Sequence, residues 1–347
     1  MGIFFPMLDF FPSAGRGPIR LAVWICCLAG SLCVVYSRRD TQVSPVPCGR
    51  EFRSDYSKNG TFTSPGYPEP YPEDIVCIYS FTGKPGERPQ ILFTDFDLHL
   101  PQAPPRDCEG VDAVMVFITI NGRRERIQNF CGNKLPAQIM SNGPNMTVEF
   151  RSHHSSPEVK GFRAIYRYVT DFGISDTKRD PGSDCTFTFR SMDRNNGTFT
   201  SPNYPGLYPR DTECHYYFQG KPNERITIAF DRFDVEGIPP CESQTSSDYV
   251  EFSNYKSSVD RKLPRLCGPK IPDPVESDGN FFRVSFKSDD KFDGTGFQAI
   301  YRFEATIDPA TVKRISSTFV EDASSVVLRQ VDCLWIIFAM MVYILLD

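Results

Sequence analysis

The seven-residue stretch "NGTFTSP" at residues 59–65 occurs a second time, letter for letter, at residues 196–202. Chance recurrence of seven specified residues is negligible in a chain of 347 residues. We therefore predict two copies of one domain, and the chain is long enough for two domains that each bury a core.

Composition and residue order indicate an all-β fold. The chain has 29 Phe, 15 Tyr and 29 Pro, with short alternating apolar runs between turn residues. Each copy closes on a stretch of this kind, "GFRAIYRY" at 161–168 and "GFQAIYRF" at 296–303, in which alternate apolar residues fall on one face. We expect an antiparallel β-sandwich in each copy. The net charge of -5, with no block of like charges, argues against a nucleic-acid partner.

Eight of the 12 cysteines repeat between the copies. They are Cys48, Cys77, Cys108 and Cys131 in the first copy and Cys185, Cys214, Cys241 and Cys267 in the second. With no CxxC pair and no histidine at zinc-finger spacing, this pattern indicates disulfides rather than zinc, and thus an oxidising compartment. Spacing alone leaves the pairing open.

The apolar ends of the chain predict export and attachment to a membrane. Residues 1–37 contain two arginines followed by an apolar run at 21–36, the pattern of a signal peptide; an uncleaved anchor is the alternative. Residues 326–347 form a C-terminal hydrophobic signal, preceded by small residues, which fits a GPI anchor; a short transmembrane segment is the alternative.

Three asparagines lie in N-glycosylation sequons, which a secretory protein can use. They are Asn59, Asn145 and Asn196. Unused surface loops are the alternative at each site.

The order of the repeated motifs resembles the CUB domain. In each copy, cysteines in register flank "TSPxYPxxYP", and "GFxAxY" closes the repeat. The resemblance covers residues 48–170 and 185–305, with a linker at 171–184 and a stalk at 306–325. It implies two jelly-roll-like sandwiches that bind proteins outside the cell. It also implies the pairs Cys48–Cys77, Cys108–Cys131, Cys185–Cys214 and Cys241–Cys267.

The resemblance further implies a calcium site in the second copy. The matching positions are Glu236, Asp248 and Asp289, with the Tyr208 hydroxyl expected to orient the glutamate. Calcium binds several oxygen ligands, and three carboxylates drawn together would repel one another without a cation. A solvated acidic surface is the alternative.

The first copy departs from this pattern. Asp112 is present, but His99 stands where the second copy has Glu236, and His153 stands in place of Asp289. Imidazoles are poor calcium ligands, so we expect calcium binding only in the second copy. These three residues could instead bind zinc or titrate near pH 6, but solvated histidines without a ligand are the favoured interpretation.

A turn-forming stretch, "NGRRER" at 121–126, could gather Arg123, Arg124 and Arg126 at a loop tip. A solvated turn is the favoured interpretation.

No enzyme motif of the GxSxG, HExxH or phosphate-loop type is present, so we predict a binding protein without a small-molecule substrate. The whole chain resembles the suppressor-of-lurcher and neuropilin/tolloid-like proteins. This resemblance implies a co-receptor or auxiliary subunit of a cell-surface receptor, of the glutamate-receptor type. The alternative is a secreted adaptor that binds matrix or a protease substrate.

Overall fold

The computed structural model describes residues 47–103, 105, 107–174, 178–242, 245–256 and 263–306. Within these ranges the regular structure is β-sheet, without an α-helix, and so without a helix that could span a membrane. The predicted signal peptide (1–37) and C-terminal signal (326–347) lie outside the described residues. The predicted stalk (306–325) also lies outside them, apart from its first residue.

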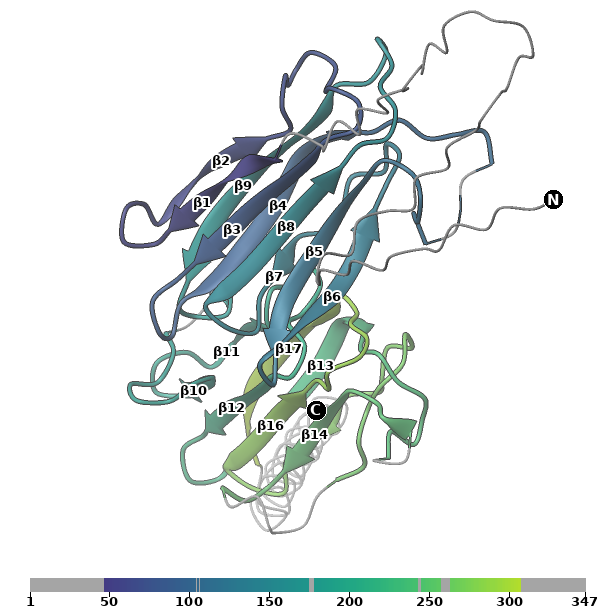
Figure 1. Ribbon diagram of the computed structural model, residues 1–347. Coiled ribbons are helices and arrows are strands. Elements are labelled where there is room, and N and C mark those ends of the chain that lie inside the picture. The colour runs from purple at the N-terminus through teal and green to yellow at the C-terminus, as the bar shows by residue number, and fades with distance from the viewer. Residues whose placement is uncertain are drawn as a thin grey trace, which may run out of the picture. The chain divides into compact units, whose positions relative to one another are not determined.

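The first repeat forms two facing sheets (Figure 1). Its strands are β1 (Pro47–Arg53), β2 (Asn59–Thr63), β3 (Val76–Thr82), β4 (Arg88–Asp97), β5 (Ala113–Ile120), β6 (Arg123–Phe130), β7 (Ile139–Met140), β8 (Asn145–Arg151) and β9 (Gly161–Val169). One sheet has the order β1-β3-β8-β5-β6, and the other has the order β2-β9-β4-β7. The predicted all-β sandwich is confirmed.

The second repeat has the same arrangement with one strand fewer. Its strands are β10 (Thr186–Arg190), β11 (Asn196–Thr200), β12 (Glu213–Gln219), β13 (Glu224–Asp234), β14 (Tyr249–Ser253), β15 (Val275–Glu276), β16 (Phe281–Lys287) and β17 (Gly296–Ala305). The sheets have the orders β10-β12-β16-β14 and β11-β17-β13-β15. Among the described residues, no strand of this repeat corresponds to β6. An isolated bridge between Val250 and Leu266 lies on that side of β14 instead.

The strands form because apolar residues alternate and bury one face. In β17, Phe297, Ala299, Tyr301 and Phe303 are all buried, as the sequence pattern predicts. The aromatic rings of the core meet mostly at steep angles, as Phe230 and Phe297 do at 86°. Such edge-to-face contacts add to the stabilisation from burial alone.

The repeated heptapeptide supplies a serine that joins the two ends of each repeat. In the second repeat, the Phe297 amide donates to Ser201 Oγ at 2.9 Å, and the Ser201 amide donates to the Phe297 carbonyl at 3.0 Å. A Cβ at Gly296, whose φ is +78°, would lie 1.9 Å from Ser201 Oγ. Ser64 and Gly161 repeat this contact in the first domain. Each serine can make these hydrogen bonds because the first residue of the last strand, Gly161 or Gly296, has no Cβ.

One strand pair in each repeat differs from the expected antiparallel arrangement. β1 pairs with β3 in parallel, and β10 pairs with β12 in parallel. The reason is that the chain crosses to the other sheet for β2 or β11 before it returns, so the third strand runs in the direction of the first.

The four disulfides are those that the resemblance implies. They are Cys48–Cys77, Cys108–Cys131, Cys185–Cys214 and Cys241–Cys267. The segment 171–184 differs from the expected exposed linker, because Phe172 and Ile174 are buried and belong to the apolar cluster of the second repeat.

Candidate functional site

Four loops of the second repeat meet at the carboxylate of Asp248. Asp248 immediately precedes β14, Glu236 follows β13, and Asp289 follows β16. Asp248 Oδ2 accepts a hydrogen bond from the Tyr208 hydroxyl at 2.6 Å, and its Oδ1 accepts one from the Asp289 amide at 2.6 Å. The predicted residues Glu236, Asp248, Asp289 and Tyr208 are therefore neighbours, and we call the three carboxylates the carboxylate site.

Tyr208 is placed differently from the expectation. Its hydroxyl donates to Asp248 and accepts from the backbone amide of Glu236 at 2.9 Å, so it holds the Glu236 backbone rather than its carboxylate. The ring itself is buried. Tyr208 thus fixes the loop after β13 against Asp248.

The electrostatics of the carboxylate site favour a cation. Burial raises the pKa of Asp248 to about 7, and the negative charges of Asp289 and Glu236 add to this rise, although two hydrogen bonds oppose it. Glu236 Oε2 is buried without a hydrogen-bond partner. A buried carboxylate oxygen without a partner is costly, and a hard divalent cation would satisfy it and relieve the repulsion.

The oxygen atoms of the three carboxylates are ligands of the kind that calcium binds. In the described part of the chain, however, no three His, Cys, Asp or Glu side chains already converge as a metal-binding group. Calcium would be held by oxygens of Glu236, Asp248 and Asp289. It would supply positive charge that neutralises these carboxylates and fixes their loops relative to one another.

The first repeat has the same hydrogen-bond frame with different side chains. The Tyr71 hydroxyl donates to Asp112 Oδ2 at 2.8 Å and accepts from the His99 amide at 2.7 Å. The His153 amide donates to Asp112 Oδ1 at 2.6 Å. Each bond has its counterpart in the second repeat. Asp112 Oδ1 also accepts a bond from the His154 amide at 3.1 Å. The two sites therefore share three corresponding bonds and differ in the side chains at the aligned positions of His99 and His153.

The structure does not bring His99, Asp112 and His153 together as a metal site. The His99 ring instead faces His154, with ring centroids 5.7 Å apart. His153 lines a separate hollow of about 270 Å³ with Arg126 and Arg151. Both carboxylate oxygens of Asp112 accept hydrogen bonds, as those of Asp248 do, so this feature does not distinguish the two sites. Sequence reasoning missed His154, although its position beside His153 was a visible signal.

Comparison with known families agrees with the repeats. The model of the CUB domain matches residues 48–166 and 185–301. The chain belongs to the CUB domain family. The two repeats are hereafter the first and second CUB domains.

Two relatives indicate which CUB proteins the chain is similar to. Human (Homo sapiens) tolloid-like protein 1 is 28% identical over 309 residues, which are 80% of this chain and 29% of the relative. Procollagen C-endopeptidase enhancer 1 of Rattus norvegicus is 30% identical over 288 residues, which are 82% of this chain and 56% of the relative. The chain thus spans 29% of the first relative and 56% of the second.

Among solved structures, the chain is similar to the CUB2 domain of MASP-1 bound to Ca2+, with 30% sequence identity. The match covers 35% of this chain and 98% of the MASP-1 chain. Its TM-score is 0.29.

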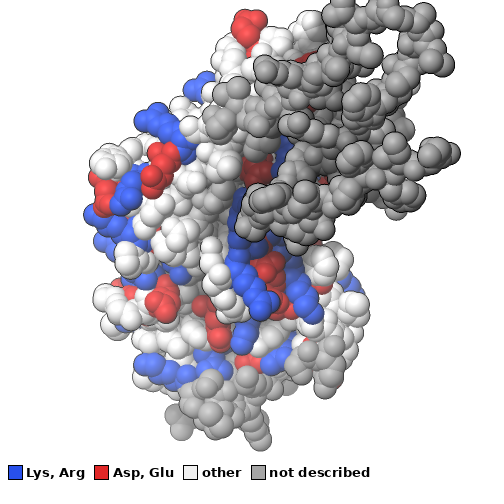
Figure 2. Space-filling view, viewed as in Figure 1, with Lys and Arg blue, Asp and Glu red and all other residues white. Residues whose placement is uncertain are grey.

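The predicted arginine cluster is largely paired within the first CUB domain. Asn121 and Gly122 form the turn, with φ angles of 51° and 76°. Arg124 lies over the Phe117 ring at 3.6 Å and contacts Glu149, and Arg126 contacts Glu109 at 3.3 Å. Figure 2 likewise shows positive and negative side chains interspersed on the visible face. These contacts favour the interpretation of an ordinary charged surface.

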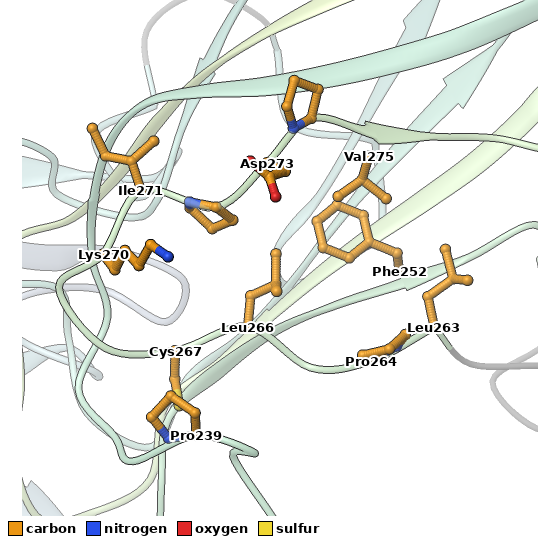
Figure 3. A pocket seen from close by; sticks show the side chains of 12 residues that line it. Pro239, Phe252, Leu263, Pro264, Leu266, Cys267, Lys270, Ile271, Asp273 and Val275 are labelled. Atoms are coloured by element: carbon orange, nitrogen blue, oxygen red, sulfur yellow. The ribbon is translucent and has the colours of Figure 1, made fainter.

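A hollow of about 470 Å³ lies in the second CUB domain (Figure 3). Its lining is Pro239, Phe252, Leu263, Pro264, Leu266, Cys267, Lys270, Ile271, Pro272, Asp273, Pro274 and Val275. We call it the apolar pocket. Sequence reasoning did not anticipate it.

Asp293 is a further carboxylate near the carboxylate site that sequence reasoning missed. Arg210 Nε donates to Asp293 Oδ2 at 2.8 Å, and both side chains are largely buried. Burial raises the pKa of Asp293, while Arg210 lowers it. Because its charge is already compensated, we do not assign Asp293 to the metal.

Replacing Tyr208 with phenylalanine is expected to weaken both the fold and the carboxylate site. Glu236 would lose the acceptor for its amide and Asp248 would lose a donor, a cost of about 2 kcal/mol in the free energy of unfolding. Calcium affinity should fall about tenfold, since groups that orient ligands have effects of this size.

Tyr71→Phe is the matched control. It removes the equivalent bonds from the first CUB domain and should destabilise that domain without changing calcium affinity. Calorimetry with and without calcium measures both effects. Equal calcium affinity in Tyr208→Phe and the unchanged protein would exclude this role for Tyr208.

Proposed function

We propose that the chain is an extracellular protein-binding adaptor. In this proposal, its second CUB domain presents a calcium-supported surface to a basic side chain of a partner. The observation that carries the proposal is the buried, unpartnered Glu236 Oε2 beside Asp248 and Asp289. Calcium would neutralise two of the three negative charges and leave a net acidic surface, to which a lysine or arginine is attracted.

Several observations support an exported binding protein. The four disulfides require an oxidising compartment during folding. Asn59, Asn145 and Asn196 are exposed at the start of β2, β8 and β11, where a glycan would not disturb the core. Almost all described residues belong to the two CUB domains. The described part of the chain therefore contains no additional domain that could be catalytic.

The relatives favour a matrix or protease-substrate adaptor over the receptor role. One of them is named as an enhancer of procollagen C-endopeptidase, and this chain aligns with 56% of it. The glutamate-receptor role stays a prediction from resemblance. The fate of the predicted C-terminal signal at 326–347 would distinguish the receptor role from the adaptor role. A surface-anchored product favours the co-receptor, and a secreted product favours the adaptor.

Surface plasmon resonance with immobilised procollagen tests the proposal. The full chain, purified from animal cells, is expected to bind in millimolar calcium and to lose at least about tenfold in affinity in EGTA. Glu236→Gln should show the same loss in calcium, because it removes one of the three carboxylate charges.

The matched control is His99→Gln at the equivalent position of the first CUB domain, which should bind like the unchanged chain. Binding that is equal in calcium and EGTA would contradict the calcium-supported surface. Absence of binding in both buffers would reject procollagen as the partner.

A further inference from the structure

The apolar pocket begins close to the carboxylate site. Pro239, which lines the pocket, is three residues from Glu236, and Gly237 lies between them. A Cβ placed on Gly237 would approach the sulfur of Cys267, another lining residue, to 2.9 Å. Ile238, in the same short connection, is 69% exposed. The pocket and the carboxylate site are therefore joined by a short, exposed apolar connection.

The pocket lies where the second CUB domain closes its sheet edge differently from the first. In the first domain, β6 pairs with β5 from Val114 to Ile120. In the second, Leu263 and Leu266 make backbone hydrogen bonds to β14 at Phe252 and Val250. The following lining residues include Pro272 and Pro274, which cannot donate to a ladder. The pocket is lined by this segment together with Phe252 of β14 and Val275 of β15.

The lining of the pocket is suited to an apolar side chain. Figure 3 shows Phe252, Leu266 and Val275 around one side of the space and Lys270 and Ile271 around another. Lys270 and Asp273 are the two charged side chains of the lining. The prolines have no amide hydrogen, so the walls offer few donors to a polar ligand. Apart from Lys270 and Asp273, the side chains of the lining are apolar, so burial of a large aliphatic group is a favourable interaction that this lining offers.

We propose that the apolar pocket and the carboxylate site form one recognition surface. Its ligand is a protein segment with a lysine or arginine and, within a few residues, a large aliphatic side chain. The basic group contacts the carboxylate site and the aliphatic side chain enters the pocket. The inference rests on the proposed function of the carboxylate site, and charge complementarity at that site selects a basic protein segment as the occupant.

Binding of synthetic peptides to the full chain in calcium tests this surface. The probes are fluorescein-labelled Gly-Ser peptides with one lysine, and with one leucine placed at the second to the fifth residue after it. An otherwise identical peptide with serine in place of leucine is the reference. Fluorescence anisotropy is expected to give at least one leucine peptide with about tenfold higher affinity than the reference.

Ile271→Ser tests the pocket itself, because Ile271 is 50% exposed and its loss should not prevent folding. It is expected to remove most of the leucine advantage while calcium affinity and binding of the serine reference stay unchanged. Ile78→Ser, at an isoleucine of the first CUB domain that is 47% exposed, is the matched control and should keep the full advantage.

The outcomes separate this inference from the proposed function. Calcium-dependent binding of lysine peptides without a preference for leucine would overturn the inference and leave the proposed function standing. A leucine preference that survives Ile271→Ser would also overturn it, because leucine would then bind elsewhere. Failure of every lysine peptide to bind, together with absence of calcium binding, would overturn both.

Discussion

Replacing Asp289 with asparagine is expected to abolish calcium binding by the second CUB domain, with a loss in affinity of at least about 100-fold. Asp289 contributes a carboxylate, while its backbone amide holds Asp248 through a 2.6 Å hydrogen bond. The substitution removes the charge and keeps this bond. Asp289 Oδ1 also accepts a bond from the Lys291 amide at 2.8 Å, which an asparagine Oδ1 can accept as well. The change is therefore expected to act on the metal rather than on the loop.

The same variant should be at least as stable as the unchanged chain when calcium is absent. The negative charge of Asp289 contributes to the raised pKa of Asp248, so its removal relieves repulsion in the metal-free domain. When calcium is present at about 100 times its dissociation constant, the unchanged chain should gain about 2.7 kcal/mol, and the variant should gain none. Calorimetric scans in calcium and in EGTA measure both quantities.

His153→Asn is the matched control, because His153 occupies the equivalent position and its amide donates to Asp112 in the same way. It is expected to leave calcium affinity unchanged. Retention of calcium-dependent stabilisation in Asp289→Asn would contradict the assignment of Asp289 as a ligand.

The double substitution His99→Glu and His153→Asp is expected to create a second calcium site, in the first CUB domain. The frame is already present: the hydroxyl of Tyr71 and the amide of His153 hold Asp112 at 2.8 and 2.6 Å. The corresponding bonds to Asp248 are both 2.6 Å. Since these bonds correspond, we expect the two side chains to decide whether calcium binds.

Calcium titration calorimetry of the double variant should give one more equivalent than the unchanged chain. The first domain should also gain thermal stability in calcium. Gln102→Glu is the control, because it adds a carboxylate at an exposed position three residues from His99, outside the frame of Tyr71, Asp112 and His153. An unchanged stoichiometry in a folded double variant would show that more than these two side chains prevents calcium binding.

The sequence contained most of the information that determines the fold. The repeated heptapeptide and the eight cysteines in register predicted two copies of one domain, and the alternation in residues 296–303 predicted which side chains of β17 are buried. These patterns are reliable because a strand with one buried face imposes a period of two on its sequence.

Features that depend on contacts across loops were not predictable in the same way. The partner of the Tyr208 hydroxyl depends on how two loops approach, and no sequence pattern distinguishes Asp248 from Glu236 as that partner. The burial of Phe172 and Ile174 was missed because the surrounding residues are polar and turn-forming. Pro272 and Pro274 were an available signal that a regular edge strand is replaced in the second domain.

Isothermal titration of the full chain with calcium tests the central claim most directly. The carboxylate site of the second CUB domain and its histidine counterpart in the first predict one calcium ion per chain. Absence of binding, or two ions per chain, would contradict the account.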